Sequence, residues 1–241
     1  PWWRDAGFSC WPQTAASAPL MRPLAPSYGS KPARAQEGNI WFASSLAEAA
    51  RLAAMLASVE QIAASQAPQR GKQILGLYAG GTLAAEAAML LAEHLGVETD
   101  AHHPDGVMLE AQGHRLIDLG DDAWTVGRPH PMIDPTNRIS RLLQEARDPE
   151  VGVIVMDFVL GFGAHEDPVG VMIEAIKEAQ AIAKADNRPL EILGYVLGTD
   201  QDPQSLAQQC QLLTDAGVIW ASSSTNTGLL AREFVCKGEN A

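Results

Sequence analysis

One stretch of the sequence, residues 151–171, constrains the fold more than any other. It begins with an apolar run rich in β-branched side chains, which is typical of a strand buried on both faces. A turn at Gly161-Phe162-Gly163 follows, and apolar side chains then recur at helical spacing from about Pro168. This order predicts a strand, a turn and a helix, a layout in which backbone N–H groups and a positive helix end can face an anion.

The same layout occurs a second time. Residues 74–78 form an apolar run that leads into Gly80-Gly81-Thr82, and a helix is expected from there to Gly96. Because strands alternate with helices from residue 74 onward, the sequence predicts an α/β fold with a mainly parallel sheet. We expect further strands at 114–119, 190–197 and 218–221, a loop or hairpin at 99–114, and further helices at 45–65 (capped by Ser44 or Ser45), 136–147, 202–213 and 226–234.

The chain is expected to consist of three segments. Residues 1–36 hold six of the 15 prolines and three of the six tryptophans without any periodicity, so we expect them to be irregular or disordered. The abrupt change in composition and the missing initiating Met lead to the hypothesis that this segment is an out-of-frame or truncated remnant. Residues 37–68 are expected to form a helical connector, and residues 71–236 a single α/β domain.

Composition and charge exclude several classes of partner. A net charge of -12 without any Lys/Arg cluster argues against a nucleic-acid interface or an anionic membrane surface. No apolar run reaches the roughly 18 residues that a membrane span needs. The three cysteines have no metal-ligand spacing and their odd number does not indicate a disulfide framework, so we predict a cytoplasmic protein without a metal site.

Candidate ligand-binding residues lie at the expected carboxyl ends of the strands, where parallel sheets bind ligands. Glycine turns before helices also form for conformational reasons alone, so anion binding and a simple tight turn remain alternatives. The acidic side chains either cap helices or form a seat for Mg²⁺ or for substrate amino groups. The candidates for anion binding are Gly80, Gly81, Thr82, Gly161 and Gly163, and those for the substrate loops are Asp118, Asp134, Asp157 and Thr199.

Two histidines are candidates for acid–base chemistry. His165 follows the second glycine turn and is either a general acid or base, or an oxyanion partner, or a solvated loop residue. His130 lies between Pro129 and Pro131, which would hold its ring still. By contrast, His102-His103 has no third ligand nearby in the sequence, so metal binding there is not expected.

Four segments of the sequence together resemble one known family. The chain is similar, over about residues 37–235, to the C-terminal part of FdrA-type proteins, which belong to the succinyl-CoA synthetase-like superfamily. The string GRPHPMIDP is quite specific, whereas the glycine turns are generic to the superfamily. The segments that carry the resemblance are NIWFASSLAEAARLA, GLYAGGTLAAEAAMLLAEHLG, HRLIDLGDDAWTVGRPHPMIDPTNR and DFVLGFGAHEDP.

This resemblance implies a flavodoxin-like ligase module that faces a second module across a shared phosphate or acyl phosphate. Residues 117–120 are similar to a Leu-Asp-Val-Gly strand end, and 161–163 to a Phe-Gly-Gly turn. It implies that Gly161, Gly163 and Ala164 supply backbone N–H donors. It also implies that the phosphohistidine of the superfamily belongs to the other module.

FdrA-type proteins are also implicated as one subunit of oxamate carbamoyltransferase, which implies a carbamoyl-phosphate transfer site. In that case Arg128 would pair with a carboxylate, and His130 and His165 would complete the catalytic set. The chain would then be part of a transferase or ligase, inactive alone, that needs a second ligase-type module or subunit and forms an oligomer. Phosphate or an acyl phosphate is the expected ligand, and CoA and Mg²⁺ are left open. The alternatives are an acyl-CoA synthetase domain and a non-catalytic interaction or assembly domain.

Overall fold

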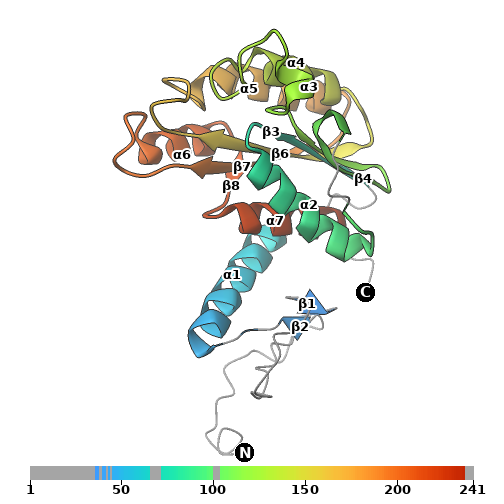
Figure 1. Ribbon diagram of the computed structural model, residues 1–241. Helices are drawn as coiled ribbons and strands as arrows, with labels where there is room; N and C mark the ends of the chain where they lie inside the picture. The colour runs from blue at the N-terminus through green and yellow to red at the C-terminus, as the bar shows by residue number, and fades with distance from the viewer. Residues whose placement is uncertain are drawn as a thin grey trace, which may run out of the picture. The chain divides into compact units, whose positions relative to one another are not determined.

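The computed structural model describes residues 36–37, 40–41, 43, 45–65, 72–99 and 104–236 (Figure 1). The segment predicted to be irregular therefore lies outside the described residues, apart from Gln36, and so does His102-His103. The chain divides into two units, residues 1–58 and 59–241. The predicted boundaries of a connector at 37–68 and a domain at 71–236 stay a prediction.

The first unit contains a short antiparallel pair, β1 (Gln36–Glu37) and β2 (Ile40–Trp41). Helix α1 (Leu46–Ser65) follows and continues into the second unit. The hydroxyl of Ser45 accepts a hydrogen bond of 3.1 Å from the backbone N–H of Glu48, which is the contact expected of an N-cap. The capping of this helix by Ser45 is thus confirmed.

The second unit is built on a six-stranded sheet. Five of its strands are parallel, and the edge strand β4 runs antiparallel to β5. A turn at Gln112-Gly113, with positive φ at both residues, joins β4 to β5, which confirms a hairpin in this region. In spatial order the strands are β4 (Val107–Ala111), β5 (His114–Asp118), β3 (Gln73–Tyr78), β6 (Val151–Val159), β7 (Glu191–Leu197) and β8 (Ile219–Trp220).

Helices cover both faces of this sheet (Figure 1). Helices α2 (Gly81–Leu95) and α7 (Ser224–Cys236) pack together on one face, whereas α4 (Thr136–Glu145) and α5 (Ile173–Ala185) pack together on the other. The predicted α/β fold with a mainly parallel sheet is confirmed. The remaining helical elements are η1 (Pro104–Gly106), α3 (Asp122–Thr125), η2 (Gly170–Met172) and α6 (Leu206–Asp215).

The order of the parallel strands is that of flavodoxin-like folds. Counted along the chain from β3, the strands β5, β3, β6, β7 and β8 lie in the order 2-1-3-4-5. In this topology the chain moves outward in opposite directions from the neighbouring strands β3 and β6. Ligands bind in such folds outside the carboxyl ends of the strands at this switch point. The fold therefore places the expected ligand site at the carboxyl ends of β3 and β6.

The hydrophobic core lies on both sides of β6, whose first eight residues are all buried. Leu142 from α4 and Ile176 from α5 are fully buried against one face. Burying each such side chain stabilises the fold by roughly 1.5–3 kcal/mol. Because these helices cannot shift without losing that packing, the loops that connect them to the strand ends are held in place.

The helix after β6 begins later than its sequence predicts. Residues 161–169 are irregular, a short 3₁₀ turn follows at Gly170–Met172, and regular helix begins only at Ile173. The side chain of Asp167 accepts a hydrogen bond of 3.1 Å from the N–H of Gly170 and so stabilises the start of this turn. The 3₁₀ turn thus begins two residues, and the regular helix five residues, after the predicted start near Pro168. Across the described part of the chain, no helix is long and apolar enough to cross a lipid bilayer.

Candidate functional site

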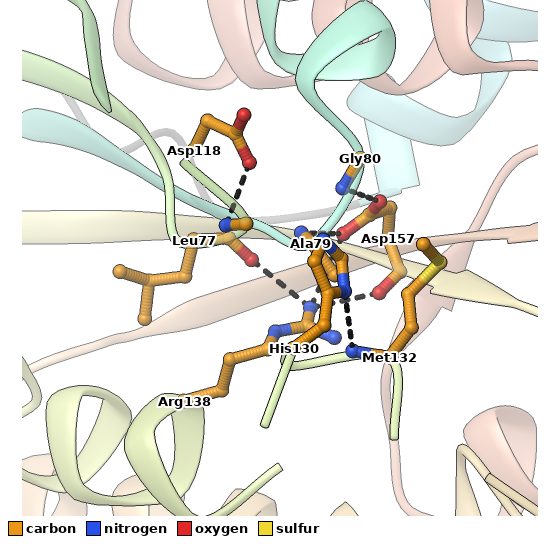
Figure 2. A network of polar contacts seen from close by, with 9 residues as sticks. Leu77, Ala79, Gly80, Asp118, His130, Met132, Arg138 and Asp157 are labelled. Carbon is orange, nitrogen blue, oxygen red and sulfur yellow. Dashed lines mark hydrogen bonds and ion pairs between the residues drawn. The ribbon is translucent and has the colours of Figure 1, made fainter. Parts of the chain in front are cut away.

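Asp157 lies near the carboxyl end of β6 and binds the turn that follows β3 (Figure 2). Its Oδ1 accepts from the N–H of Ala79 at 2.7 Å, and its Oδ2 accepts from the N–H of Gly80 at 2.9 Å. The side chain is 0% exposed. An internal carboxylate thus uses the amide of Gly80, which corrects the expectation that this amide is free for an external anion.

Arg138 of α4 holds Asp157 in this position (Figure 2). Its Nη2 donates to the backbone oxygens of Leu77 at 3.0 Å and of Asp157 at 2.7 Å, and lies 3.3 Å from Asp157 Oδ1. The guanidinium also lies over the ring of Phe158, 5.5 Å from its centroid. A single side chain therefore ties α4 to the ends of both β3 and β6.

Sequence reasoning missed Arg138, although a signal was present. Arg138, Leu142 and Glu145 are the buried residues of α4, and their spacing of four and three residues places them on one face of the helix. A charged residue on the same stripe as a core leucine has to find a buried partner, since an isolated buried charge is very costly. Glu145 meets this need through Arg115 at 2.7 Å and Arg141 at 2.8 Å.

Burial dominates the electrostatics of the ion pair. It raises the pKa of the Asp157 carboxyl group, and Arg138 and the amides of Ala79 and Gly80 oppose part of that rise. Burial likewise lowers the pKa of the Arg138 guanidinium, against the stabilising effect of Asp157. The two charges compensate each other, so the pair adds no net charge to the site.

A second carboxylate, Asp118, lies at the carboxyl end of β5 and faces the start of α2. Its Oδ1 accepts from the N–H of Gly120 at 2.8 Å, and its Oδ2 lies 2.6 Å from the point that a Cβ at Gly81 would occupy. Glycine at position 81 therefore allows the carboxylate to approach the helix. Burial raises the pKa of Asp118, with smaller contributions of the same sign from Asp157 and Asp121.

His130 reaches this cluster from the loop between α3 and α4. Its Nδ1 accepts from the N–H of Met132 at 3.2 Å, so a neutral ring carries its proton on Nε2. That Nε2 lies 2.5 Å from the position of a Cβ at Gly120, beside the carbonyl oxygen of Ala79 and Oδ1 of Asp118. The structure thus brings together three predicted site residues, His130, Asp118 and Asp157.

His165 lies on the other side of the same loop. Its backbone N–H donates to the carbonyl oxygen of Met132 at 2.7 Å, and its Nδ1 accepts from the N–H of Asp167 at 3.0 Å. A neutral His165 therefore also presents Nε2–H. Nearby, hydrogen bonds from the hydroxyl and N–H of Thr136 lower the pKa of Asp134, and His165 adds to this effect. Asp134, just before the N-cap residue Pro135, thus stabilises the turn that leads into α4.

The turn at Gly161-Phe162-Gly163 was expected to offer free N–H donors to an anion, but the structure shows other partners for two of the amides in this region. The N–H of Gly161 donates to Oε1 of Gln204 at 3.0 Å, while Nε2 of Gln204 donates to the carbonyl oxygens of Gly161 and His165. The N–H of Ala164 donates to the carbonyl oxygen of Gly161 at 3.2 Å. Gly161 and Ala164 therefore use their amides internally, which corrects the expectation of free donors. Nothing local in the sequence indicates Gln204, which lies 43 residues from Gly161.

The remaining predicted site residues lie at the start of α2, on the loop before His130, and on the turns after β6 and β7. Gly81 and Thr82 are the first residues of α2, and Gly163 lies exposed on the turn after β6. Arg128 is exposed on the loop before His130. Thr199 donates through its N–H and hydroxyl to Oδ2 of Asp202, so it stabilises the turn after β7. Among the residues that the structure describes, no group of three His, Cys, Asp or Glu side chains could hold a metal ion.

Comparison with known proteins identifies the family. A model of the CoA-ligase family matches residues 77–234, which include all six strands of the sheet except the first four residues of β3. The chain belongs to the CoA-ligase family.

One curated relative and two solved structures resemble this CoA-ligase domain. The "Uncharacterized protein YahF" of Escherichia coli K12 is 55% identical over 225 residues, which cover 85% of this chain and 44% of YahF. PH0766 from Pyrococcus horikoshii OT3 has a TM-score of 0.46 at 14% identity, over 83% of this chain and 42% of that one. A dinucleotide-forming acetyl-coenzyme A synthetase 1 from Ca. Korarchaeum cryptofilum, in complex with phosphate and ADP, has a TM-score of 0.44 at 15% identity, over 83% and 40%. The chain spans less than half the length of each.

Proposed function

We propose that this domain is one half of an acyl- or carbamoyl-phosphate transfer site, of the type found in FdrA-like oxamate carbamoyltransferase subunits. A second ligase-type module or subunit would complete the site. The observation that carries the proposal is the position of His130 and Asp118 beside the N-terminus of α2, at the switch point of a CoA-ligase domain.

The first turn of α2 would supply the N–H donors and the positive potential that a phosphate needs. The amides of Gly81 and Thr82 have no acceptor four residues earlier within the helix, and the helix dipole adds positive potential at this end. A phosphate oxygen bound here would lie near the imidazole of His130. The pair of Asp157 and Arg138 keeps the preceding turn fixed, which limits reorganisation when charge develops.

The proposed reaction transfers a carbamoyl group from nitrogen to phosphate. A phosphate oxygen attacks the carbamoyl carbon, the bond from that carbon to the nitrogen breaks, and the leaving nitrogen takes a proton. The Nε2–H of His130 would donate this proton, and the imidazole would recover one from the phosphate. His165 presents the same tautomer from the neighbouring loop and is the second candidate for this role. Arg128, which is exposed, would bind a substrate carboxylate through two parallel hydrogen bonds.

The proposal extends to the ligand, the oligomeric state and the contact with the second module. The ligand would be phosphate or an acyl phosphate, and CoA and Mg²⁺ stay open. We also propose an oligomeric, cytoplasmic protein, in keeping with the composition and the cysteine spacing. Phe162, which is 96% exposed on the turn after β6, is a natural contact for the second module.

Two other functions have specific support. Membership of the CoA-ligase family favours an acyl-CoA synthetase domain, in which CoA itself would bind. The internal use of the amides of Gly80, Gly161 and Ala164 favours a non-catalytic assembly domain, because these donors are no longer available to an anion.

Calorimetric titration of phosphate, carbamoyl phosphate and CoA separates these functions. The ligands are added to the chain alone and to the chain co-expressed with a second ligase-type module. Transfer chemistry predicts binding of the phosphate ligands to the assembly, weakened about tenfold or more by His130→Ala, since the Nε2–H donor to the charged phosphate is lost. His94→Ala, at the exposed far end of α2, is the matched control. Binding of CoA alone would favour the synthetase, and assembly without any ligand binding would favour the structural role.

A further inference from the structure

A small cavity of about 10 Å³ lies beside Arg138, close to the ends of β3 and β6. The loop that contains Met132 and the segment that contains His165 form part of its wall, together with Phe158, Val159 and Val171. The only two polar side chains among the lining residues are Arg138 and His165. The cavity is thus lined mostly by apolar residues, with a buried arginine and a histidine as the polar ones.

Arg138, which lines this cavity, has a buried donor that no described residue uses. A guanidinium has five N–H groups in a fixed plane. All the hydrogen bonds that Arg138 makes within the described residues come from Nη2, and its Nε is buried without a partner there. Arg138 is 4% exposed and its Nε is buried, so bulk water cannot satisfy this donor. Because buried polar groups are almost always paired, Nε needs an acceptor that the described residues do not supply.

Size and charge define what the acceptor can be. A cavity of this volume holds roughly one water molecule or one atom of a larger ligand. The charge of Arg138 is already balanced by Asp157, with Nη2 and Oδ1 3.3 Å apart. The occupant therefore needs a lone pair but no negative charge of its own.

We propose that the cavity beside Arg138 is a binding site for a single uncharged oxygen acceptor. In the free protein this acceptor is a water molecule that receives hydrogen bonds from the guanidinium. In the loaded protein the carbonyl oxygen of the transferred acyl or carbamoyl group replaces the water. This second step rests on the proposed function, whereas the first does not.

A high-resolution crystal structure of the full chain without ligand tests the first step. The expected result is a solvent peak in the cavity, within hydrogen-bond distance of Nε or Nη1 of Arg138. An empty cavity would overturn the proposal, and so would a guanidinium turned so that Nε and Nη1 bond to protein oxygens. This measurement needs no substitution, so it does not depend on whether a variant of a buried arginine folds.

Filling the cavity gives an independent test that leaves Arg138 in place. Val171→Ile adds one methyl group to the wall, and the expected result is loss of the solvent peak with the hydrogen bonds from Nη2 to Leu77 and Asp157 retained. Val97→Ile, after the end of α2, is the matched control and keeps the peak. A peak that persists unchanged in the first variant would show that the acceptor does not bind in this cavity.

Crystals of the chain assembled with a second ligase-type module, with and without carbamoyl phosphate, distinguish the two sources of oxygen. The proposal expects the carbonyl oxygen of the ligand at the solvent position. If carbamoyl phosphate binds while the water stays in place, the second step is wrong. If carbamoyl phosphate does not bind at all but the water is present, the proposed function fails and the oxygen site beside Arg138 stands.

Discussion

Arg138 and Asp157, 19 residues apart in the sequence, form a buried ion pair with 3.3 Å between Nη2 and Oδ1. The pair lies at the switch point of the sheet and orients the turn from β3 into α2 through the amides of Ala79 and Gly80. Its effect on function is therefore indirect. It fixes the turn after β3, beside which His130 and Asp118 lie, and Nε of Arg138 stays unused by the described residues.

Removing one partner of this pair should be much more harmful than removing both. Asp157→Ala leaves Arg138 as an uncompensated buried charge, and we expect a loss of about 3–5 kcal/mol in the free energy of unfolding. Arg138→Met alone should cost a similar amount, whereas the double variant should cost less than the sum of the two. Urea denaturation of the four proteins measures this coupling. Additive losses would contradict a direct interaction of the two side chains.

The buried carboxyl group of Asp118 should make stability depend on pH. Because burial raises its pKa in the folded protein, the folded state holds this proton more tightly than the unfolded chain does. Its contribution to stability is therefore greatest below the ordinary carboxyl pKa of about 3.9, and it falls as the pH rises through the folded-state pKa.

Asp118→Asn removes this titration while its amide oxygen can still accept from Gly120. We expect the variant to gain stability relative to the wild type as the pH rises towards neutrality, and to lose that gain below about pH 4. Urea unfolding at several pH values is the measurement, with the exposed Glu110→Gln on β4 as control. A difference between variant and wild type that does not change with pH would contradict the account.

The side chain of Gln204 should control the order of the turn after β6. In Gln204→Glu a carboxylate replaces the amide that donates to the carbonyl oxygens of Gly161 and His165, so two acceptors lose their donor. We expect roughly 1–3 kcal/mol of destabilisation and faster hydrogen exchange at the amide of Gly161. Gln208→Glu, exposed on α6, makes the same change of charge without these hydrogen bonds. Equal exchange rates in the two variants would refute this role.

Phe162 should matter for association and not for folding. Its side chain is 96% exposed, so Phe162→Ser is expected to change the free energy of unfolding by no more than about 0.5 kcal/mol. If the turn contacts a second module, the same substitution weakens the assembly, which sedimentation velocity of the co-expressed proteins measures. Met89→Ser, at another exposed apolar position on α2, is the control. Unchanged assembly in both variants would remove Phe162 from the proposed interface.

The alternation of apolar runs and glycine turns predicts most of the fold, because the central strands β3 and β6 are buried and each turn is local. The position of Asp157 and Asp118 at strand ends also follows from the sequence. The hydrogen-bond and ion-pair partners of these two carboxylates do not follow from the sequence. Arg138 lies in a polar helix, and its burial depends on how α4 packs against β3 and β6. The amides of Gly161 and Ala164 look free in the sequence, but the Gln204 side chain and the Gly161 carbonyl use them. Such interactions depend on tertiary packing, which local patterns do not record.

The measurement that tests the central claim most directly is the affinity of carbamoyl phosphate for the chain alone and for the chain co-expressed with a second ligase-type module, by calorimetry. Half a transfer site predicts that the assembly binds carbamoyl phosphate at least about tenfold more tightly than the chain alone, and that His130→Ala removes this gain. Equal affinity of the two samples, or an assembly that binds CoA but not carbamoyl phosphate, would contradict it.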